Sequence, residues 1–184
     1  MSSARKAVFL DRDGVLNLPV VREGRPHPPA TLAQLEIYAG AAEALARLKQ
    51  AGYLLIVVTN QPDVARGTQS RETVEAMNAA IGARLPIDEF LVCWHDDRDG
   101  CDCRKPKPGL VVGAAASHGV DLRQSFLIGD RWRDIECGAA AGVRTVLIDR
   151  QYRERSASTP PDFIAETLPG AADWILSVRD RTLE

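Results

Sequence analysis

Short apolar runs recur along the chain, and segments with the helical spacing of apolar residues lie between most of them. A strand buried on both faces reads as a continuous apolar run rather than an alternating one. Because such runs alternate with helical patterns, we predict a doubly wound parallel sheet covered on both faces, a three-layer α/β/α fold. The predicted strands are residues 7–10, 53–58, 90–92, 126–128 and 145–148.

Four helices are predicted between these strands, each with an apolar stripe and a recognisable end. Gly favours the position just after a helix, Pro stops a helix, and Ser caps a helix start. The predicted helices are residues 41–51 (before Gly52), 71–85 (between Ser70 and Pro86), 110–118 (before Gly119) and 133–141 (before Gly142).

Two segments break this alternation. Residues 15–40 contain too many prolines for a helix and are predicted to form a long loop or a short hairpin. His27 in this segment shows no partner in the sequence and is interpreted as structural. The tail from Gln151 is rich in Ser, Thr and Pro, and order is predicted to return in an edge strand at residues 163–164 and a helix at residues 171–178.

The composition is that of an ordinary globular chain. Its 184 residues, 45% apolar and 26% charged, suit one domain over residues 1–184. A net charge of -2 gives no electrostatic reason to expect binding to nucleic acid or to a membrane surface. No apolar run approaches the roughly 20 residues that cross a membrane. The N-terminus lacks a signal-peptide pattern, so a cytoplasmic location is predicted, with cysteines as thiols or metal ligands.

Polar side chains follow several of the predicted strands. The first strand ends in Asp11 and Asp13, which can face one volume because residues two apart in extended chain share a side. Two anions so close favour a bound cation or a protonated carboxyl, although a solvated turn explains this pair alone about as well. Thr59, Asn60 and Asp130 follow other strands, and ligands of parallel sheets bind beyond the carboxyl ends of the strands.

A basic pair, Arg104 and Lys105, precedes the third predicted helix. Singly, Thr59 is more simply a turn residue and Lys105 a surface residue. Together with the acids, however, they offer a nucleophile, donors for phosphoryl oxygens and ligands for a divalent cation. The combination therefore favours phosphoryl transfer on a small phosphorylated metabolite.

Four motifs in order resemble those of the haloacid dehalogenase (HAD) superfamily of phosphatases. This resemblance extends over residues 6–150 and implies a Rossmann-like HAD core that hydrolyses phosphate esters through an aspartyl-phosphate. The motifs are Asp11-Arg12-Asp13-Gly14, Val57-Val58-Thr59-Asn60, Arg104-Lys105-Pro106 and Gly129-Asp130-Arg131-Trp132-Arg133-Asp134.

The resemblance also implies a role for each motif residue. Asp11 is expected to take the phosphoryl group, and Asp13 to protonate the leaving oxygen and then accept a proton from water. Mg²⁺ is expected to bind the Asp11 carboxylate, the Asp13 backbone carbonyl and Asp130, a donor set that suits a hard cation. Thr59 is expected to bind the phosphoryl oxygens, and Lys105 to neutralise charge between the nucleophile and the phosphate. Substrate contacts are implied for Asn60, Arg104 and Arg131, and a supporting role for Asp134.

A cluster of soft ligands lies in residues 93–103. Cys93, His95, Cys101 and Cys103 supply three sulfurs and one imidazole, a recurring ligand set for structural Zn²⁺. The residues between them are polar and could not pack a loop by themselves, so a metal would replace the missing core. The alternatives to a zinc site are a disulfide and free surface thiols. A disulfide is not expected in the cytoplasm, and three free thiols are not expected so close together in the sequence. The sequence therefore predicts a zinc-binding loop that delivers Arg104 and Lys105.

This cluster narrows the resemblance to the D-glycero-D-manno-heptose 1,7-bisphosphate phosphatases and the related histidinol-phosphate phosphatases. Ala65-Arg66-Gly67 belongs to the same pattern. Members lack a separate cap domain, and neither residues 15–40 nor residues 105–125 have room for one. The resemblance implies removal of the 7-phosphate of heptose 1,7-bisphosphate, and the small capless chain suggests a monomer. Arginine pairs bidentately with phosphate, so Arg104, and less directly Arg66 or Arg22, suit a second phosphate.

The chain departs from the family pattern at the substrate end. Pro62-Asp63 stands where Ser-Gly is usual, and Arg131 where the heptose enzymes usually carry lysine. Asp63 adds an anion near the place expected for a second phosphate, which leaves histidinol phosphate, with its cationic amine, as an alternative substrate. A non-catalytic, zinc-stabilised binding protein is the rival from a different class.

Overall fold

A six-stranded parallel sheet forms the centre of the protein. The computed structural model describes residues 4–180, with side chains through residue 178. The strand order is β5-β4-β1-β6-β7-β8, and every neighbouring pair is parallel. The strands are β1 (Lys6–Leu10), β4 (Tyr53–Asn60), β5 (Glu89–Cys93), β6 (Phe126–Gly129), β7 (Arg144–Ile148) and β8 (Phe163–Ala165).

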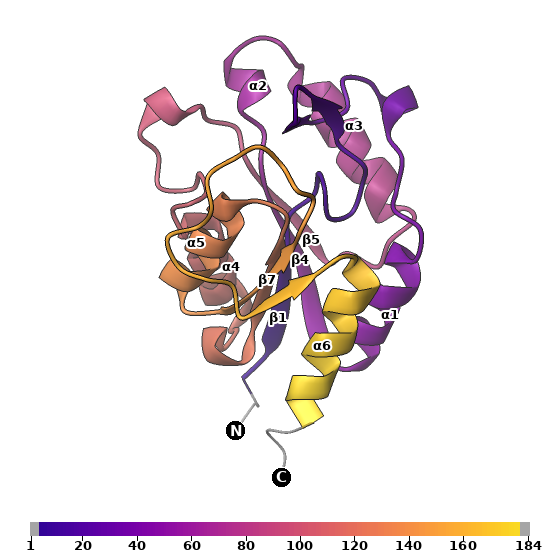
Figure 1. Ribbon diagram of the computed structural model, residues 1–184, viewed down its shortest axis with the longest axis vertical. Coiled ribbons are helices and arrows are strands. Elements are labelled where there is room, and N and C mark those ends of the chain that lie inside the picture. Colours follow the sequence, from indigo (N-terminus) through magenta and orange to yellow (C-terminus); the bar gives the residue numbers. More distant parts are fainter. Residues whose placement is uncertain (1–3, 181–184) are drawn as a thin grey trace.

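Helices cover both faces of this sheet (Figure 1). Side chains alternate along β1, so Val8 and Leu10 join the core under α1 (Ala41–Gln50) and α6 (Leu168–Asp180). Ala7 and Phe9 join a second core under α4 (Gly109–His118) and α5 (Trp132–Ala141). The predicted three-layer α/β/α fold is confirmed. Within residues 4–180, no helix is long and apolar enough to cross a membrane.

All five predicted helices are present, with ends that differ from the prediction by a few residues. Ser70 caps α3 (Arg71–Gly82) by accepting a hydrogen bond from the Thr73 backbone N–H at 3.1 Å. The helix ends at Gly82 and not at Leu85, although the Leu85 N–H still donates to the Ile81 carbonyl at 2.8 Å. A four-residue helix, α2 (Pro62–Ala65), was not predicted, because a single turn leaves no periodic apolar pattern.

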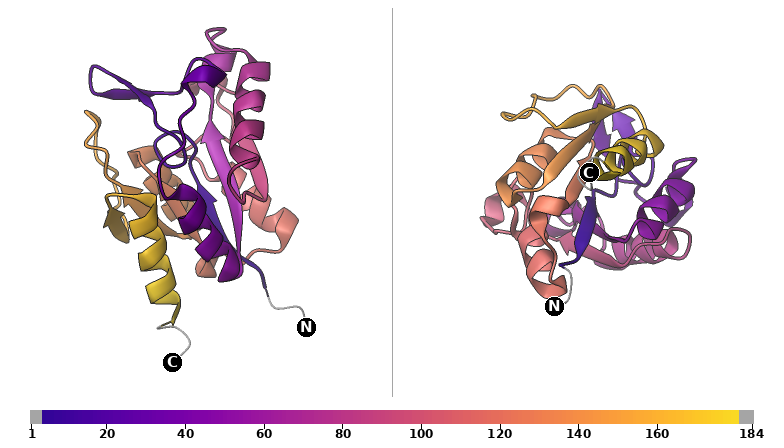
Figure 2. Two further views of the ribbon diagram at one scale, coloured as in Figure 1. Left: turned by 90° about the vertical axis from the view of Figure 1, so that its right-hand side faces the viewer. Right: turned by 90° about the horizontal axis from the view of Figure 1, so that it is seen from below.

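Both irregular segments lie at the carboxyl end of the sheet. Residues 15–40 contain a short hairpin of β2 (Val20–Arg22) and β3 (Arg25–His27), as predicted, and a 3₁₀ turn at Leu32–Gln34. Figure 2 shows this hairpin and the segment after β7 projecting from the same side of the molecule. The two segments touch, since the Arg153 N–H donates to the Gly24 carbonyl at 3.0 Å. Further 3₁₀ turns occur at Asp97–Asp99 and Leu122–Gln124.

Candidate active site

A cavity of about 690 Å³ opens at the carboxyl edge of the sheet, where β1, β4 and β6 end. Its floor and walls come from these strand ends, from the loop before α4 and from the start of α5. Its mouth lies between the hairpin and residues 153–155. Every motif residue predicted for the site lines it: Asp11, Asp13, Thr59, Asn60, Arg104, Lys105, Asp130 and Arg131.

Asp11 stands at the floor of the cavity as the first residue after β1. Its backbone N–H donates to the Ile128 carbonyl at 2.9 Å, which fixes it beside β6. Its carboxylate lies 3.0 Å from the Lys105 ammonium, which is 2% exposed and also lies 2.6 Å from Asp134. Burial raises the pKa of Asp11 to about 6, and Asp134 and Asp13 act in the same direction, while Lys105 opposes the rise.

Asp13 is held by donors on both carboxylate oxygens. The fully buried Arg12 lies 3.0 Å from Oδ2, and Gln61 donates to the same oxygen at 2.9 Å. Asn17 donates to Oδ1 at 2.9 Å, while Arg12 also donates to Asn78 at 3.0 Å. Since Arg12, Gln61 and Asn17 restrict its rotation, the Asp13 carboxylate is positioned before any substrate binds.

Thr59 and Asn60 close the side of the cavity formed by β4. The Thr59 hydroxyl is buried and accepts a hydrogen bond from Gln61 at 3.0 Å. The Asn60 side chain donates to the Lys105 carbonyl at 3.0 Å and accepts from the Lys105 N–H at 3.1 Å. Asn60 lines the cavity, but its amide is engaged with this backbone. It therefore ties the end of β4 to the loop that carries Lys105.

Asp11, Asp130 and Asp134 bring carboxylate oxygens within 4.8 Å of one another, all three side chains being buried. Burial, Asp11 and Asp134 raise the pKa of Asp130 well above its ordinary value. Its Oδ1 is buried and has no hydrogen-bond partner among the described residues. Such an unsatisfied anionic oxygen is costly in a protein interior. Oxygen donors of this number and kind fit Mg²⁺, so the residues present suit the predicted ion.

Gly14 makes room for this cluster. Its φ of +85° is a left-handed conformation that side-chain-bearing residues rarely adopt. A Cβ at this position would lie 1.7 Å from Asp130 Oδ2, so any larger residue would displace the carboxylate. The sequence motif therefore needs glycine here for two separate reasons.

Acids already pair with most of the arginines that line the cavity. Arg104 donates to Asp97 at 2.8 Å, Arg66 lies 2.6 Å from Asp96, and Arg131 forms a bidentate ion pair with Glu154. Arg25 and Arg153, at the mouth, have no carboxylate partner among the described residues. Arg22, on β2, is not among the residues that line the cavity. The mouth is thus the part of the site with unneutralised positive charge.

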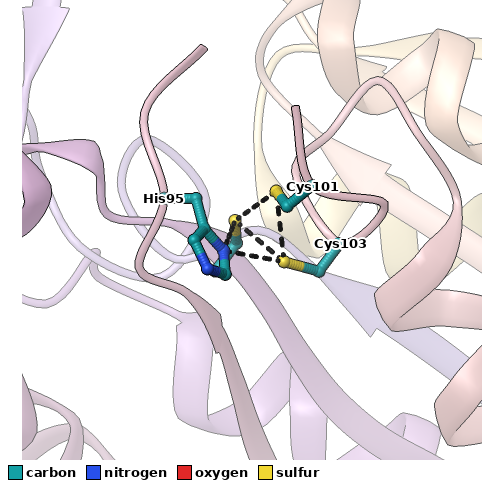
Figure 3. A group of neighbouring side chains, drawn as sticks. His95, Cys101 and Cys103 are labelled. Atoms are coloured by element: carbon teal, nitrogen blue, oxygen red, sulfur yellow. Dashed lines mark hydrogen bonds between the residues drawn. The ribbon is translucent and has the colours of Figure 1, made fainter. Parts of the chain in front are cut away.

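The four zinc ligands predicted from sequence converge on one point. Figure 3 shows His95, Cys101 and Cys103 directed toward one another. The ligand atoms of these residues and of Cys93 all lie within 4.8 Å of one another. Cys103 Sγ lies 3.2 Å from Cys93 Sγ and 3.4 Å from Cys101 Sγ, and His95 Nδ1 lies 3.3 Å from Cys103 Sγ. Thiolates bound to one zinc at 2.3 Å stand roughly 3.8 Å apart, so the arrangement fits a closed tetrahedral site.

This cluster joins the sheet to the cavity. Cys93 is the last residue of β5, and its carbonyl accepts the Gln61 N–H at 2.8 Å. Cys103 directly precedes Arg104, which also donates to the His95 carbonyl at 3.4 Å. A metal at this position would therefore fix the start of the loop that places Lys105 against Asp11.

The raised pKa of Asp11 predicts a pH dependence of stability in the metal-free protein. Because the folded pKa of about 6 exceeds the ordinary 3.8, the folded state binds this proton more tightly than the unfolded chain does. The resulting contribution to the unfolding free energy is present below about pH 4 and is lost as pH rises to about 6. Asp11→Asn, which cannot ionise, lacks it. Urea titrations in EDTA should show the variant gaining stability relative to wild type over this interval, and a constant difference would contradict the assigned shift.

No role was predicted from the sequence for Gln61, Asn17 or Tyr152. Gln61 bridges Asp13 and Thr59, Asn17 holds Asp13, and Tyr152 donates to Asp130 at 2.8 Å. Gln61 and Asn17 stand next to the motifs, and that proximity was an available signal. Tyr152 lies in the Ser- and Pro-rich tail, where no pattern in the sequence marks it. His27, interpreted as structural, lines the cavity mouth.

Comparison with known proteins places the chain among related enzymes. Residues 102–171 match the family model described as "HAD-hyrolase-like". A Salmonella typhi D-glycero-beta-D-manno-heptose-1,7-bisphosphate 7-phosphatase is 33% identical over 96% of this chain and 93% of its own length. The enzyme of the same name from Pasteurella multocida is 37% identical over 78% of this chain and 82% of its own.

Solved structures agree with this result. The D,D-heptose 1,7-bisphosphate phosphatase of B. bronchiseptica, crystallised with magnesium and phosphate, superposes with a TM-score of 0.80 at 28% identity, covering 95% of this chain and 99% of that one. A parallel sheet with clustered acids and a lysine beyond its carboxyl edge is the arrangement of the HAD-like hydrolases. The chain belongs to this class, in the family of the D-glycero-beta-D-manno-heptose-1,7-bisphosphate 7-phosphatases.

Proposed function

We propose that the protein is a Mg²⁺-dependent phosphatase that removes the 7-phosphate of D-glycero-D-manno-heptose 1,7-bisphosphate through an aspartyl-phosphate. The observation that carries this proposal is the contact between Asp11 and Lys105 at 3.0 Å beside the Asp130 carboxylate. A buried lysine lowers the repulsion between a carboxylate nucleophile and an incoming phosphoryl group. The names of the relatives support the choice of substrate.

The first chemical step joins Asp11 to phosphorus. An Asp11 oxygen attacks, the ester P–O bond breaks, and the leaving sugar oxygen takes the proton carried by Asp13. In the second step water attacks the aspartyl-phosphate, its proton passes to Asp13, and the Asp11 carboxylate and inorganic phosphate are released. The Thr59 hydroxyl and the Lys105 ammonium bind the phosphoryl oxygens in both steps.

The metal ligands in this proposal come from the chain's own acids. Asp11, the Asp13 carbonyl and Asp130 would hold Mg²⁺, which supplies positive charge to the transferring phosphoryl group. Asp134 lies 2.6 Å from Lys105 and accepts the Arg131 N–H at 3.1 Å, so it positions the site. Zn²⁺ bound by Cys93, His95, Cys101 and Cys103 would fix the neighbouring loop.

The cationic mouth supports a substrate with a second phosphate. Arg104 and Arg131 are proposed as substrate contacts that would each exchange an acidic partner for phosphate. Asn60 is proposed to border the substrate while its amide holds the Lys105 backbone. Histidinol phosphate is the alternative substrate, because Asp63 lines the same cavity and would attract its amine. We further propose that residues 1–184 act as a single domain and a monomer in the cytoplasm, a compartment in which free thiolates persist.

Steady-state kinetics test the proposed substrate. The kcat/KM for the heptose bisphosphate should exceed those for histidinol phosphate and fructose bisphosphate by at least about 100-fold, or roughly 2.7 kcal/mol in transition-state stabilisation. EDTA should abolish turnover, and added Mg²⁺ should restore it. A preference for histidinol phosphate would move the proposal to the alternative substrate. Failure of every phosphate ester, with Mg²⁺ present, would favour a binding protein.

A further inference from the structure

The segment after β7 contacts the site and the elements around it at several places. Residues 149–158 leave the sheet, run beside the cavity and return toward β8. Five of its contacts join this segment to residues at least 19 positions away in the sequence. They are Arg150 to the Gly14 carbonyl at 2.9 and 3.0 Å, Tyr152 to Asp130 at 2.8 Å, the Arg153 N–H to the Gly24 carbonyl at 3.0 Å, Glu154 to Arg131, and Arg155 to Glu136 at 2.8 Å.

Tyr152 makes the one of these contacts that reaches an expected metal ligand. Its phenolic O–H donates to Oδ2 of Asp130, a residue only 4% exposed. The other oxygen, Oδ1, is buried and unpaired among the described residues. The two carboxylate oxygens of Asp130 therefore have different surroundings. Oδ2 accepts the hydrogen bond from Tyr152, and Oδ1 is left without a partner and can bind a cation.

The surroundings leave little freedom for this pair. A Cβ at Gly14 would lie 3.1 Å from the Tyr152 hydroxyl and 1.7 Å from Asp130 Oδ2, so backbone, phenol and carboxylate meet at one place. On the other side, Arg150 binds the Gly14 carbonyl and fixes the chain two residues before Tyr152. Hydrogen bonds that orient metal-binding carboxylates contribute to metal affinity even though they do not touch the ion.

We propose that Tyr152 is a positioning residue that orients Asp130 toward Mg²⁺. The role rests on the proposed function, because it requires the cation that the function needs. The hydroxyl keeps the carboxylate from rotating and so prearranges Oδ1. It takes no part in bond making or breaking, and its loss should weaken metal binding more than the chemical step.

Tyr152→Phe tests the role by removing the hydroxyl and keeping the ring. Calorimetric titration of the substrate-free protein with Mg²⁺ should give a Kd raised about 10-fold or more, the size typical for loss of a group that orients a ligand. At saturating Mg²⁺, kcat should stay within about 2-fold of wild type, while the Mg²⁺ concentration for half-maximal rate rises with Kd. Tyr53→Phe is the matched control, because it also removes one phenolic hydroxyl. Tyr53 begins β4, at the end of the strand away from the cavity, so this variant should leave the Mg²⁺ Kd unchanged.

A second measurement, of Tm against Mg²⁺ concentration, separates weaker metal binding from a general loss of stability in Tyr152→Phe. The Mg²⁺ Kd is obtained from how Tm rises with Mg²⁺ concentration in each protein, relative to the metal-free Tm of the same protein, so a lower starting Tm does not affect the comparison. A Tyr152→Phe protein that binds Mg²⁺ as wild type does, in both measurements, would overturn the inference. If wild type bound no Mg²⁺ and hydrolysed no phosphate ester, the proposed function itself would be wrong.

Discussion

Replacing Asp11 with asparagine is expected to lower kcat by at least about 10⁴-fold, because no other group can take its place as the nucleophile. The amide lacks the charge needed for attack on phosphorus, and it offers the cation a weaker ligand. The fold should survive, since burial disfavours the ionised carboxylate and asparagine avoids that cost. Turnover under Mg²⁺ saturation and the Tm of the same sample would be measured together.

A matched control separates the loss of the nucleophile from a general loss of acidic charge. Asp173→Asn makes the same chemical change on α6, where the side chain is 62% exposed and paired with Arg47. That variant should keep wild-type kcat and nearly wild-type Tm, since exposed ion pairs contribute little to stability. Ordinary turnover by Asp11→Asn would remove the basis for covalent catalysis at this position.

The second large effect is expected at the zinc cluster. Purified protein should contain about one Zn²⁺ per chain, and Cys103→Ser should lose most of it, because a hydroxyl is a poor ligand for zinc. The unfolding free energy should fall by about 2–4 kcal/mol, the usual size for a lost cross-link. The kcat/KM should fall as well, because Arg104 and Lys105 follow Cys103 directly. Elemental analysis, urea unfolding and kinetics measure the three quantities.

Cys137→Ser is the control for this variant. Cys137 is fully buried but lies on α5, outside the cluster. The variant should lose some stability from the buried hydroxyl and yet retain full zinc content. Zinc-free wild-type protein with unchanged stability and kcat/KM would contradict the structural role of the metal.

The strands and the chemistry at their ends could be predicted from the sequence for one physical reason. Doubly covered parallel strands are apolar throughout, so polar residues become visible where they end. Asp11, Thr59 and Asp130 each follow such a run, and parallel strands bring these ends to one edge. The cysteine cluster was equally visible, because its four ligands lie within residues 93–103.

The contacts that join distant segments could not be predicted in this way. Tyr152 reaches Asp130 across 22 positions, and Arg150 reaches Gly14 across 136. Neither belongs to a periodic pattern, since each depends on how a loop folds back over the cavity. The ion pair between Arg104 and Asp97 could not be predicted either, because the sequence shows both charges but not that their side chains meet. We propose that substrate selection depends on such contacts, and for this reason the substrate was harder to predict than the reaction.

In the proposed reaction, Asp11 carries the phosphoryl group during turnover. The direct measurement is rapid acid quenching of the enzyme with Mg²⁺ and substrate, borohydride reduction of any acyl phosphate, and mass spectrometry of the peptide that contains residues 7–22. We expect homoserine at position 11, formed only when substrate is present and absent from Asp11→Asn. Steady turnover with no reduced residue at position 11, or with the label on a different acid, would contradict it.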